Sequence, residues 1–284
     1  MVTSTTAMRR PDPKSLVSFF SRALTSFQSS SDAFRVLCTL PHANAESPAP
    51  RRPVGPVSNL VVLDSSFNPP TRAHASMARA ALDAEATQGT QRRLMLLLSV
   101  NNADKAPKPA SFPVRLGMMD AMGRQLLEAM SEDGVEIDLA VTTMPFFHDK
   151  ARAITQGGFY SATPTTFLVG FDTLVRILDG KYYGGEGGMR RALGPFFAGG
   201  ARLRVTTRGD AGAQRAWAAE EAGTCAAEEA GAWAEQVEVA EAGALEDGVS
   251  SSRVREVVSE GGGVEELVGG EVAAWIEREG LYRG

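Results

Sequence analysis

The sequence is poor in the side chains that build disulfide and metal sites. Its 284 residues include two cysteines, Cys38 and Cys225, and three histidines, His42, His74 and His148. Two distant cysteines form neither a disulfide framework nor the paired spacing of a zinc site, which is typical of a protein in a reducing compartment. No group of three or more cysteines and histidines lies close together along the chain, so we expect no metal site built by the protein.

Several patterns are missing altogether. No apolar run approaches the roughly 20 residues of a transmembrane helix, so no membrane contact is expected. The first residues lack the charged-then-apolar pattern of a secretory signal, which predicts a cytoplasmic protein and leaves a nuclear or mitochondrial share open. Neither the P-loop pattern G-x-x-x-x-G-K-[ST] nor the dinucleotide pattern G-x-G-x-x-G occurs, so the glycine-rich stretches are poor cofactor candidates.

Charge is spread unevenly, although the net charge is only −5. Residues 1–60 carry seven Lys/Arg against three Asp/Glu, or +4, whereas residues 210–247 carry ten acids against one arginine, or −9. A polymer-binding surface would need a basic stripe, so no nucleic-acid polymer is expected as a partner. A small anionic ligand held by local positive groups fits this balance better. A homo-oligomer or a protein partner stays open.

Apolar periodicity predicts alternating strands and helices after an N-terminal region. Residues 1–58 are expected to hold a disordered tail, a helix over 14–28 that packs on the domain rather than serving as a mitochondrial presequence, and a Pro-rich linker. Residues 59–284 are expected to form one α/β domain, a doubly wound, Rossmann-like parallel sheet with a helical C-terminal region. Within it, the Gly-rich stretch 184–200 predicts a surface excursion, and residues 264–279 predict the last helix.

One stretch, residues 61–74, combines a strand, a turn and the start of a helix. A short apolar run predicts a buried strand that ends at Asp64, and a double proline then forces a turn. Thr71 can cap a helix over residues 72–84, which places His74 in the first turn, beside unpaired backbone N–H groups and the positive end of the helix dipole. This arrangement favours a bound anion, most often phosphate, with a purely capping or surface histidine as the alternative.

A second string, V-S-S-S-R-V-R at residues 249–255, places hydroxyls and arginines at another helix start. The hydroxyls supply a cap and spare donors, and Arg253 and Arg255 supply fixed positive charge. By itself, such a string is more often a surface helix start with exposed arginines.

Together, the two strings resemble the motifs of the nucleotidylyltransferase superfamily, particularly its nicotinamide mononucleotide adenylyltransferases. S-F-N-P-P-T-x-x-H is similar to the family's (G/S)-S-F-N-P-x-(T/H)-x-x-H, and the second string is similar to I-S-S-T-x-I-R, which holds the ATP phosphates. Residues 144–154 and 171–179 resemble a divergent fungal branch. The resemblance implies ATP-binding roles for Ser66, Phe67, Thr71, His74, Ser251, Ser252 and Arg255, with His74 and Arg255 catalytic.

Weaker correspondences follow in the family's order. Lys105, in the loop after the strand 94–98, matches a phosphate-contacting lysine and is the third catalytic candidate. Gly170 and Asp172 match a G-x-D at a strand end, where glycine permits close backbone approach and aspartate accepts from ribose hydroxyls, with a simple helix cap as the alternative. Arg208 matches a V-x-R. Two further basic candidates are Lys108 and Arg115.

The resemblance implies transfer of AMP from ATP, with its Mg²⁺, to nicotinamide mononucleotide, which gives NAD and pyrophosphate. Two departures bear on this: Ser65 stands where the family usually has glycine, and the family's pyridine-stacking tryptophan segment is replaced by one containing Phe146 and Phe147. The alternatives are nucleotidylyl transfer to another phosphorylated acceptor, and an ATP-binding or ATP-hydrolysing adaptor on the same fold.

Overall fold

The computed structural model describes residues 11–84, 91–100, 109–130, 134–161, 163–207, 211–225, 233–241 and 248–283. The strands are β1 (Phe34–Leu40), β2 (Leu60–Asp64), β3 (Arg92–Ser99), β4 (Val135–Thr142), β5 (Thr165–Gly170), β6 (Ala201–Thr207) and β7 (Val237–Glu241). The α-helices are α1 (Pro13–Gln28), α2 (Arg72–Ala84), α3 (Phe112–Met130), α4 (Phe147–Gln156), α5 (Phe171–Ile177), α6 (Glu186–Ala198), α7 (Ala211–Cys225), α8 (Ser251–Ser259) and α9 (Gly270–Arg278). No helix in these ranges is long and apolar enough to span a bilayer.

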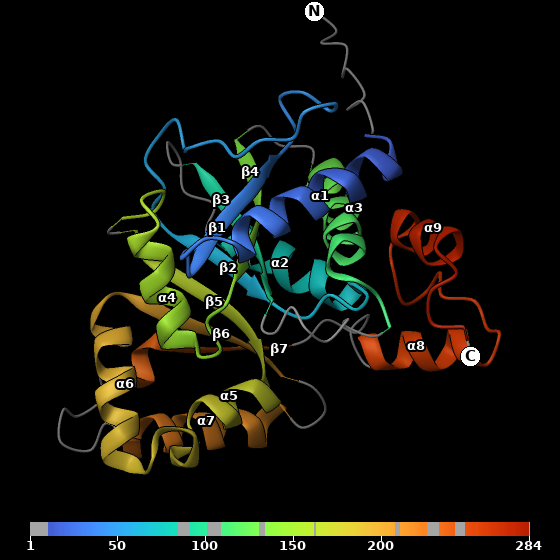
Figure 1. Ribbon diagram of the computed structural model, residues 1–284. Helices are drawn as coiled ribbons and strands as arrows, with labels where there is room; N and C mark the ends of the chain where they lie inside the picture. Colours follow the sequence, from blue (N-terminus) through green and yellow to red (C-terminus); the bar gives the residue numbers. More distant parts are fainter. Residues whose placement is uncertain are drawn as a thin grey trace, which may run out of the picture.

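The strands form one sheet in the order β1-β4-β3-β2-β5-β6-β7 (Figure 1). All neighbouring pairs are parallel except β1 with β4. The chain leaves β2 toward β3 and β4, then returns to β5 on the other side of β2. This reversal creates a topological switch point between β2 and β5, where doubly wound sheets bind ligands at the carboxyl ends of their strands. The predicted α/β fold class is confirmed.

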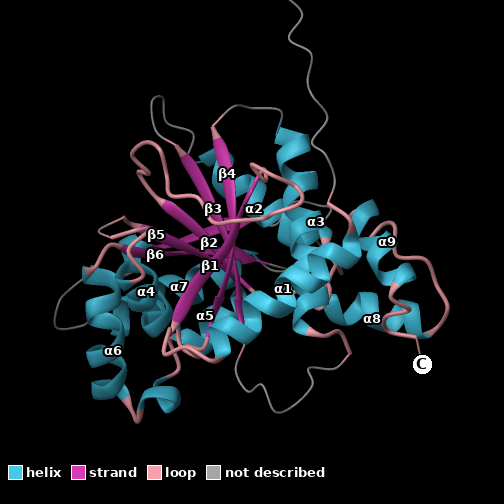
Figure 2. Cartoon of the chain, turned by 45° about the horizontal axis from the view of Figure 1, so that its top comes forward, coloured by secondary structure: helices cyan, strands magenta, loops and turns pink. Residues whose placement is uncertain are grey.

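Helices cover both faces of the sheet (Figure 2). One apolar core joins the sheet to α1, α2, α3, α8 and α9, and a second joins its other face to α4, α5, α6 and α7. The predicted strand 94–98 shows why such burial is readable in sequence: residues 93–98 of β3 are all buried, as expected for a strand covered on both faces.

Three expectations differ from the structure. Residues 34–40, whose apolar pattern was not assigned to a strand, form the antiparallel edge β1, so the sheet is not parallel throughout. The stretch 184–200 is mostly α6 and not a surface excursion, because Met189, Leu193, Phe196 and Phe197 are buried against the second core. The last helix begins at Gly270 and not at residue 264. The carbonyls of Glu265 and Leu267 accept hydrogen bonds from Arg72, so they are not paired within a helix. The Ala/Glu-rich residues 211–234 also predict a helical region; residues 211–225 form it as α7, and residues 226–232 lie outside the described residues.

The predicted N-terminal region packs against the sheet where strands β3 and β4 begin. The helix expected over 14–28 is confirmed as α1 and packs beside α3 (Figure 1). Residues 41–58 contain no helix or strand, but Arg51 donates to Glu136 of β4, and its carbonyl accepts from the fully buried Arg93. Arg93 also pairs with Asp138 at 2.9 Å. A buried polar network therefore holds residues 41–58 against the amino-terminal ends of β3 and β4.

Candidate active site

The two motif strings meet at the switch point. Residues 65–71 leave β2 at its carboxyl end, and α8 begins close to them although it is far away in sequence. The hydroxyl of Ser251 donates to the carbonyl of Pro69 at 2.7 Å, and Arg255 Nη1 donates to the carbonyl of Asn68 at 2.8 Å. Arg255 Nη2 also donates to Ser252 Oγ at 3.0 Å. The tertiary structure thus joins, through direct hydrogen bonds, two strings that sequence order alone leaves apart.

His74 is oriented by a capping box at the start of α2. The N–H of His74 reaches Thr71 Oγ1 at 3.5 Å, and the backbone N–H of Thr71 donates back to His74 Nδ1 at 3.0 Å. This reciprocal pair is the geometry usually made by Ser/Thr at the cap and Glu/Gln three residues later. Because a backbone donor faces Nδ1, the neutral ring carries its proton on Nε2. Its donor edge is therefore directed away from the helix.

Two neighbours hold the ring of His74. Ser65 Oγ lies 2.9 Å from His74 Nε2, so the serine that replaces the family's glycine contacts the very nitrogen that would face an anion. The fully buried ring of Phe67 packs beside His74 with centroids 5.4 Å apart. Phe67 has φ of 45°, a left-handed conformation uncommon for a non-glycine residue. Phe67 thus fixes the loop by burial and leaves the exposed Ser66 beside it facing solvent.

Arg115 supports the same loop from behind. Its Nη1 donates to the carbonyl of Ser66 at 3.3 Å, and its Nε donates to the carbonyl of Ala110 at 2.9 Å. Burial lowers the pKa of Arg115, with Tyr282 acting in the opposite direction and Arg255 in the same direction. Arg115 is only 6% exposed, so the structure gives this predicted cation a buried, loop-supporting position and not a solvated one.

Gly170 and Asp172 occupy the other side of the switch point. Gly170 precedes α5 in an extended conformation, and a Cβ built there would meet no atom within 4 Å. Asp172 lies exposed in the first turn of α5 and makes no side-chain cap, so the capping alternative is not what the structure has. Three sequence candidates, Lys105, Lys108 and Arg208, lie outside the described residues.

A cavity of about 610 Å³ opens beside these loops. Its volume lies within the range of small-molecule sites. The polar floor includes Asp64, Ser65, Ser66 and Ser99 from the ends of β2 and β3, and aromatic rings form much of the wall: Phe146, Phe147, Tyr182 and Tyr183. Phe146 is 37% exposed, so part of its ring is accessible from the cavity that it lines.

A buried ion pair in this floor was not foreseen. The ammonium of Lys150 on α4 pairs with the carboxylate of Asp64 at the end of β2. Burial raises the pKa of Asp64, and Lys150 lowers it in part. Ser99 Oγ lies next to Asp64 in the cavity lining and, like Lys150, acts to lower the pKa of Asp64. Asp64 and Lys150 are 86 positions apart in sequence, so no local sequence pattern could have paired them.

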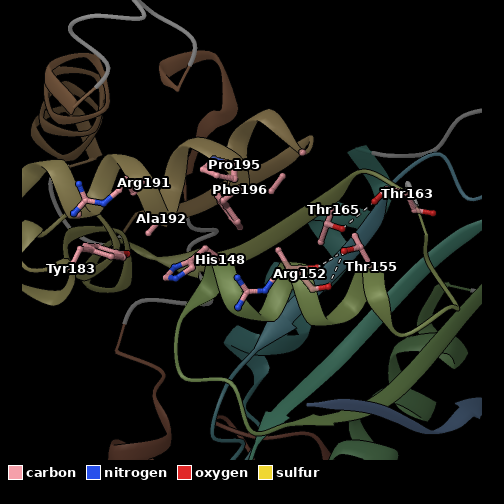
Figure 3. Close-up of a pocket in the computed structure, with 14 residues that line it drawn as sticks. His148, Arg152, Thr155, Thr163, Thr165, Tyr183, Arg191, Ala192, Pro195 and Phe196 are labelled. Atoms are coloured by element: carbon pink, nitrogen blue, oxygen red, sulfur yellow. Dashed lines mark hydrogen bonds between the residues drawn. The ribbon is translucent and has the colours of Figure 1, made fainter. Parts of the chain in front are cut away.

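A second cavity, of about 540 Å³, lies between α4 and α6 (Figure 3). The rings of Phe146, His148 and Tyr183 lie between the two cavities. His148 stacks on Phe146 with ring centroids 5.6 Å apart, and the ring centroid of Tyr183 lies 5.8 Å from that of His148. Burial lowers the pKa of His148, opposed by the carboxylate of Asp149. None of the residues from the two motif strings lines this cavity, so the candidate site is the first one.

Comparison with solved structures identifies the fold. The structure superposes on nicotinic acid mononucleotide adenylyltransferase of Plasmodium falciparum complexed with NaAD, with a TM-score of 0.50 and 15% identity over 79% of this chain and 97% of that one. The same enzyme complexed with APC gives a TM-score of 0.51 at 13% identity, with the same coverage. The chain therefore has the Rossmann-like nucleotidylyltransferase fold.

A more specific likeness comes from sequence. The chain is 40% identical over 139 residues to a Schizosaccharomyces pombe protein whose name marks it as a candidate nicotinamide mononucleotide adenylyltransferase. The match covers 49% of each protein, so the chain spans about half the length of this curated relative. No family model matches the chain. The resemblance predicted from the two motif strings is confirmed by this relative and by the structural neighbours.

Proposed function

We propose that the chain transfers AMP from ATP to a pyridine mononucleotide, nicotinamide mononucleotide in particular, giving NAD and pyrophosphate. One observation carries the proposal: Ser251 and Arg255 are hydrogen-bonded to the loop that presents His74, beside an aromatic-walled cavity at the switch point. The name of the S. pombe relative and the fold of the P. falciparum enzyme support the same reaction class.

The chemistry requires positioning more than proton transfer. The 5′-phosphate of the acceptor attacks the α-phosphorus of ATP, a new P–O bond forms, and the bond from the α-phosphorus to the bridging oxygen breaks as pyrophosphate leaves. A phosphate nucleophile is already ionised at neutral pH, so no general base is needed. Catalysis then depends on alignment of the reacting groups and on donors directed at charge that moves onto pyrophosphate.

The residues of the site supply these donors. His74 would donate from Nε2, and Arg255 would add a fixed, forked cation, with the hydroxyl of Ser252 beside it. Lys105 remains the third proposed phosphate contact. On the other side of the switch point, Asp172 would accept from ribose hydroxyls. The described residues hold no cluster of three or more His, Cys, Asp or Glu side chains suited to a metal ion. Mg²⁺ would enter with ATP, on its phosphates.

The acceptor would occupy the aromatic cavity. Phe146 offers an exposed ring for pyridine stacking, in place of the family's tryptophan segment. The part of the floor at Asp64 favours the nicotinamide form, because this carboxylate is already paired with the buried Lys150. A neutral carboxamide can donate to the carboxylate of Asp64 and accept from Ser99, whereas the carboxylate of nicotinate would be placed near a like charge. Arg176 also lines the cavity and, as a cation, would favour nicotinate instead, so both acceptors must be assayed.

A direct assay tests this function. Purified protein is incubated with Mg-ATP and either nicotinamide or nicotinate mononucleotide, and NAD, its acid analogue, pyrophosphate and phosphate are each quantified. NAD with equimolar pyrophosphate is expected, with the nicotinamide substrate preferred. Pyrophosphate that appears only with a different phosphorylated acceptor would redirect the substrate. Phosphate alone would replace the proposal by the ATP-hydrolysing adaptor.

A further inference from the structure

The last residues of the chain turn back onto the motif loop. Helix α9 ends in a Schellman turn, in which the N–H of Leu281 donates to the carbonyl of Ile276 at 3.0 Å and that of Gly280 to the carbonyl of Glu277 at 3.2 Å. Gly280 has φ of 58°, the left-handed conformation that this turn requires. The turn reverses the chain, and the side chain of Tyr282 is buried as a result.

Tyr282 contacts the residue that Arg255 also contacts. Its hydroxyl donates to Asn68 Oδ1 at 3.0 Å, while the backbone carbonyl of Asn68 accepts from Arg255 at 2.8 Å. Burial raises the pKa of Tyr282 despite the nearby positive charges of Arg115 and Arg255, so the hydroxyl keeps its proton and remains a donor at neutral pH. Tyr282 is itself held at φ of 65°, a conformation that a bulky residue adopts only when its surroundings impose it.

The surroundings of Tyr282 do impose a position. At the first turn of α9, Glu271 pairs with Arg124 of α3 at 2.6 Å, and both side chains are largely buried. Further along, the ring of Trp275 lies so close to α3 that a Cβ at Gly117 would come within 2.5 Å of it. Helix α9 is thus fixed to α3 at its start and middle, and it delivers Tyr282 to the loop with little freedom.

We propose that Tyr282 is a positioning residue for the phosphate loop: its hydroxyl fixes the side chain of Asn68, so that the Asn68 carbonyl, Arg255 and the following turn keep the geometry that holds ATP during transfer. Tyr282 touches no reacting atom in this role. The inference rests on the proposed function only for its catalytic consequence, because the hydrogen bond and the loop exist whatever the acceptor is.

Tyr282→Phe tests the role, because it removes the hydroxyl and keeps the ring. We expect kcat for dinucleotide formation to fall about ten-fold, since small misplacements of reacting groups have large effects on rate. The unfolding midpoint should fall by no more than about 2–4 °C, as for the loss of one hydrogen bond. Leu281→Ala is the matched control: it removes a neighbouring buried side chain that cannot hydrogen-bond to Asn68, and it should lower the midpoint further while kcat stays near wild type.

A second background separates positioning from general stability. If Tyr282 acts through Asn68, then Tyr282→Phe introduced into Asn68→Ala should cause no additional loss of kcat. Losses that multiply would overturn the proposal, and so would a Tyr282→Phe enzyme with wild-type kcat.

A second readout, amide hydrogen exchange, does not depend on the acceptor. If the wild-type protein makes no dinucleotide, the proposed function fails, and Tyr282 is then judged by amide hydrogen exchange over residues 65–74. Faster exchange in Tyr282→Phe than in Leu281→Ala supports positioning. Equal exchange in the two variants refutes it.

Discussion

Replacement of His74 by glutamine separates two jobs that one side chain performs. Nδ1 of His74 accepts the backbone N–H of Thr71, while Nε2 points toward Ser65 and the proposed triphosphate. Glutamine is a usual partner at this position of a capping box, so its side-chain oxygen can take over the bond to Thr71. The amide nitrogen of glutamine is also a donor, but it lies on a flexible chain and not on a rigid ring held between Thr71 and Ser65. Alanine removes both functions.

The expected magnitudes differ accordingly. Loss of a single transition-state donor typically lowers kcat by about 10²–10³, or about 2.7–4 kcal/mol. Both His74→Gln and His74→Ala should show this loss. Loss of the capping box should cost about 0.5–2 kcal/mol of unfolding free energy, and it should appear in His74→Ala only.

Two measurements check this pair of variants. Turnover is followed as NAD formed from saturating Mg-ATP and nicotinamide mononucleotide, and unfolding free energy is measured by urea denaturation. A His74→Ala enzyme with wild-type kcat would remove the Nε2 donor from the mechanism. Equal destabilisation of the two variants would show that the reciprocal bonds at Thr71 contribute nothing to the helix start.

Three further predictions concern other parts of the site. Arg255→Lys keeps the charge but loses the fork, and it should lower kcat/KM by about 10²-fold, whereas Arg253→Lys, at an exposed arginine paired with Glu256, should behave as wild type in the same steady-state assay. Phe146→Ala should raise KM for the mononucleotide by about three- to ten-fold and leave KM for ATP unchanged; a shift in both constants would argue against a stacking role. Because burial raises the pKa of Asp64, the folded protein binds its proton more tightly than the unfolded chain does, so this contribution to stability is full below pH 3.8 and is lost as pH rises through the folded pKa. Urea denaturation from pH 3 to 7 should show that fall in wild type relative to Asp64→Asn, and identical pH profiles would contradict it.

The departure at Ser65 acquires a physical meaning in the structure. A glycine at this position would leave His74 Nε2 without the hydroxyl that lies 2.9 Å away. If phosphate binds at His74 Nε2 as proposed, Ser65 has to release this nitrogen or share it. Serine in place of glycine at position 65 therefore changes the hydrogen bonding of His74.

Local patterns in the sequence determined much of the fold. The apolar run of β3, the double proline after β2 and the cap at Thr71 specify their elements from neighbours in sequence, and α2 has the predicted bounds of residues 72–84. The segment α6 was missed because its glycines and Pro195 weaken helix propensity, and only burial of Phe196 and Phe197 against the sheet compensates. Edge strand β1 was missed for a related reason: its pairing with β4 spans about 100 positions.

The candidate site also has features that the sequence determined and features that only the tertiary structure decided. The sequence by itself determined the chemical groups of the two motif strings, their order, and the placement of His74 in a first helical turn, because these depend on residue type and short spacing. Only the tertiary structure decided that Ser251 and Arg255 bond to the loop before His74, that Lys150 pairs with Asp64, and that Tyr282 reaches Asn68. Those contacts join residues roughly 85 to 215 positions apart. They form because the sheet order and the packing of α8 and α9 bring them together, which no local pattern encodes.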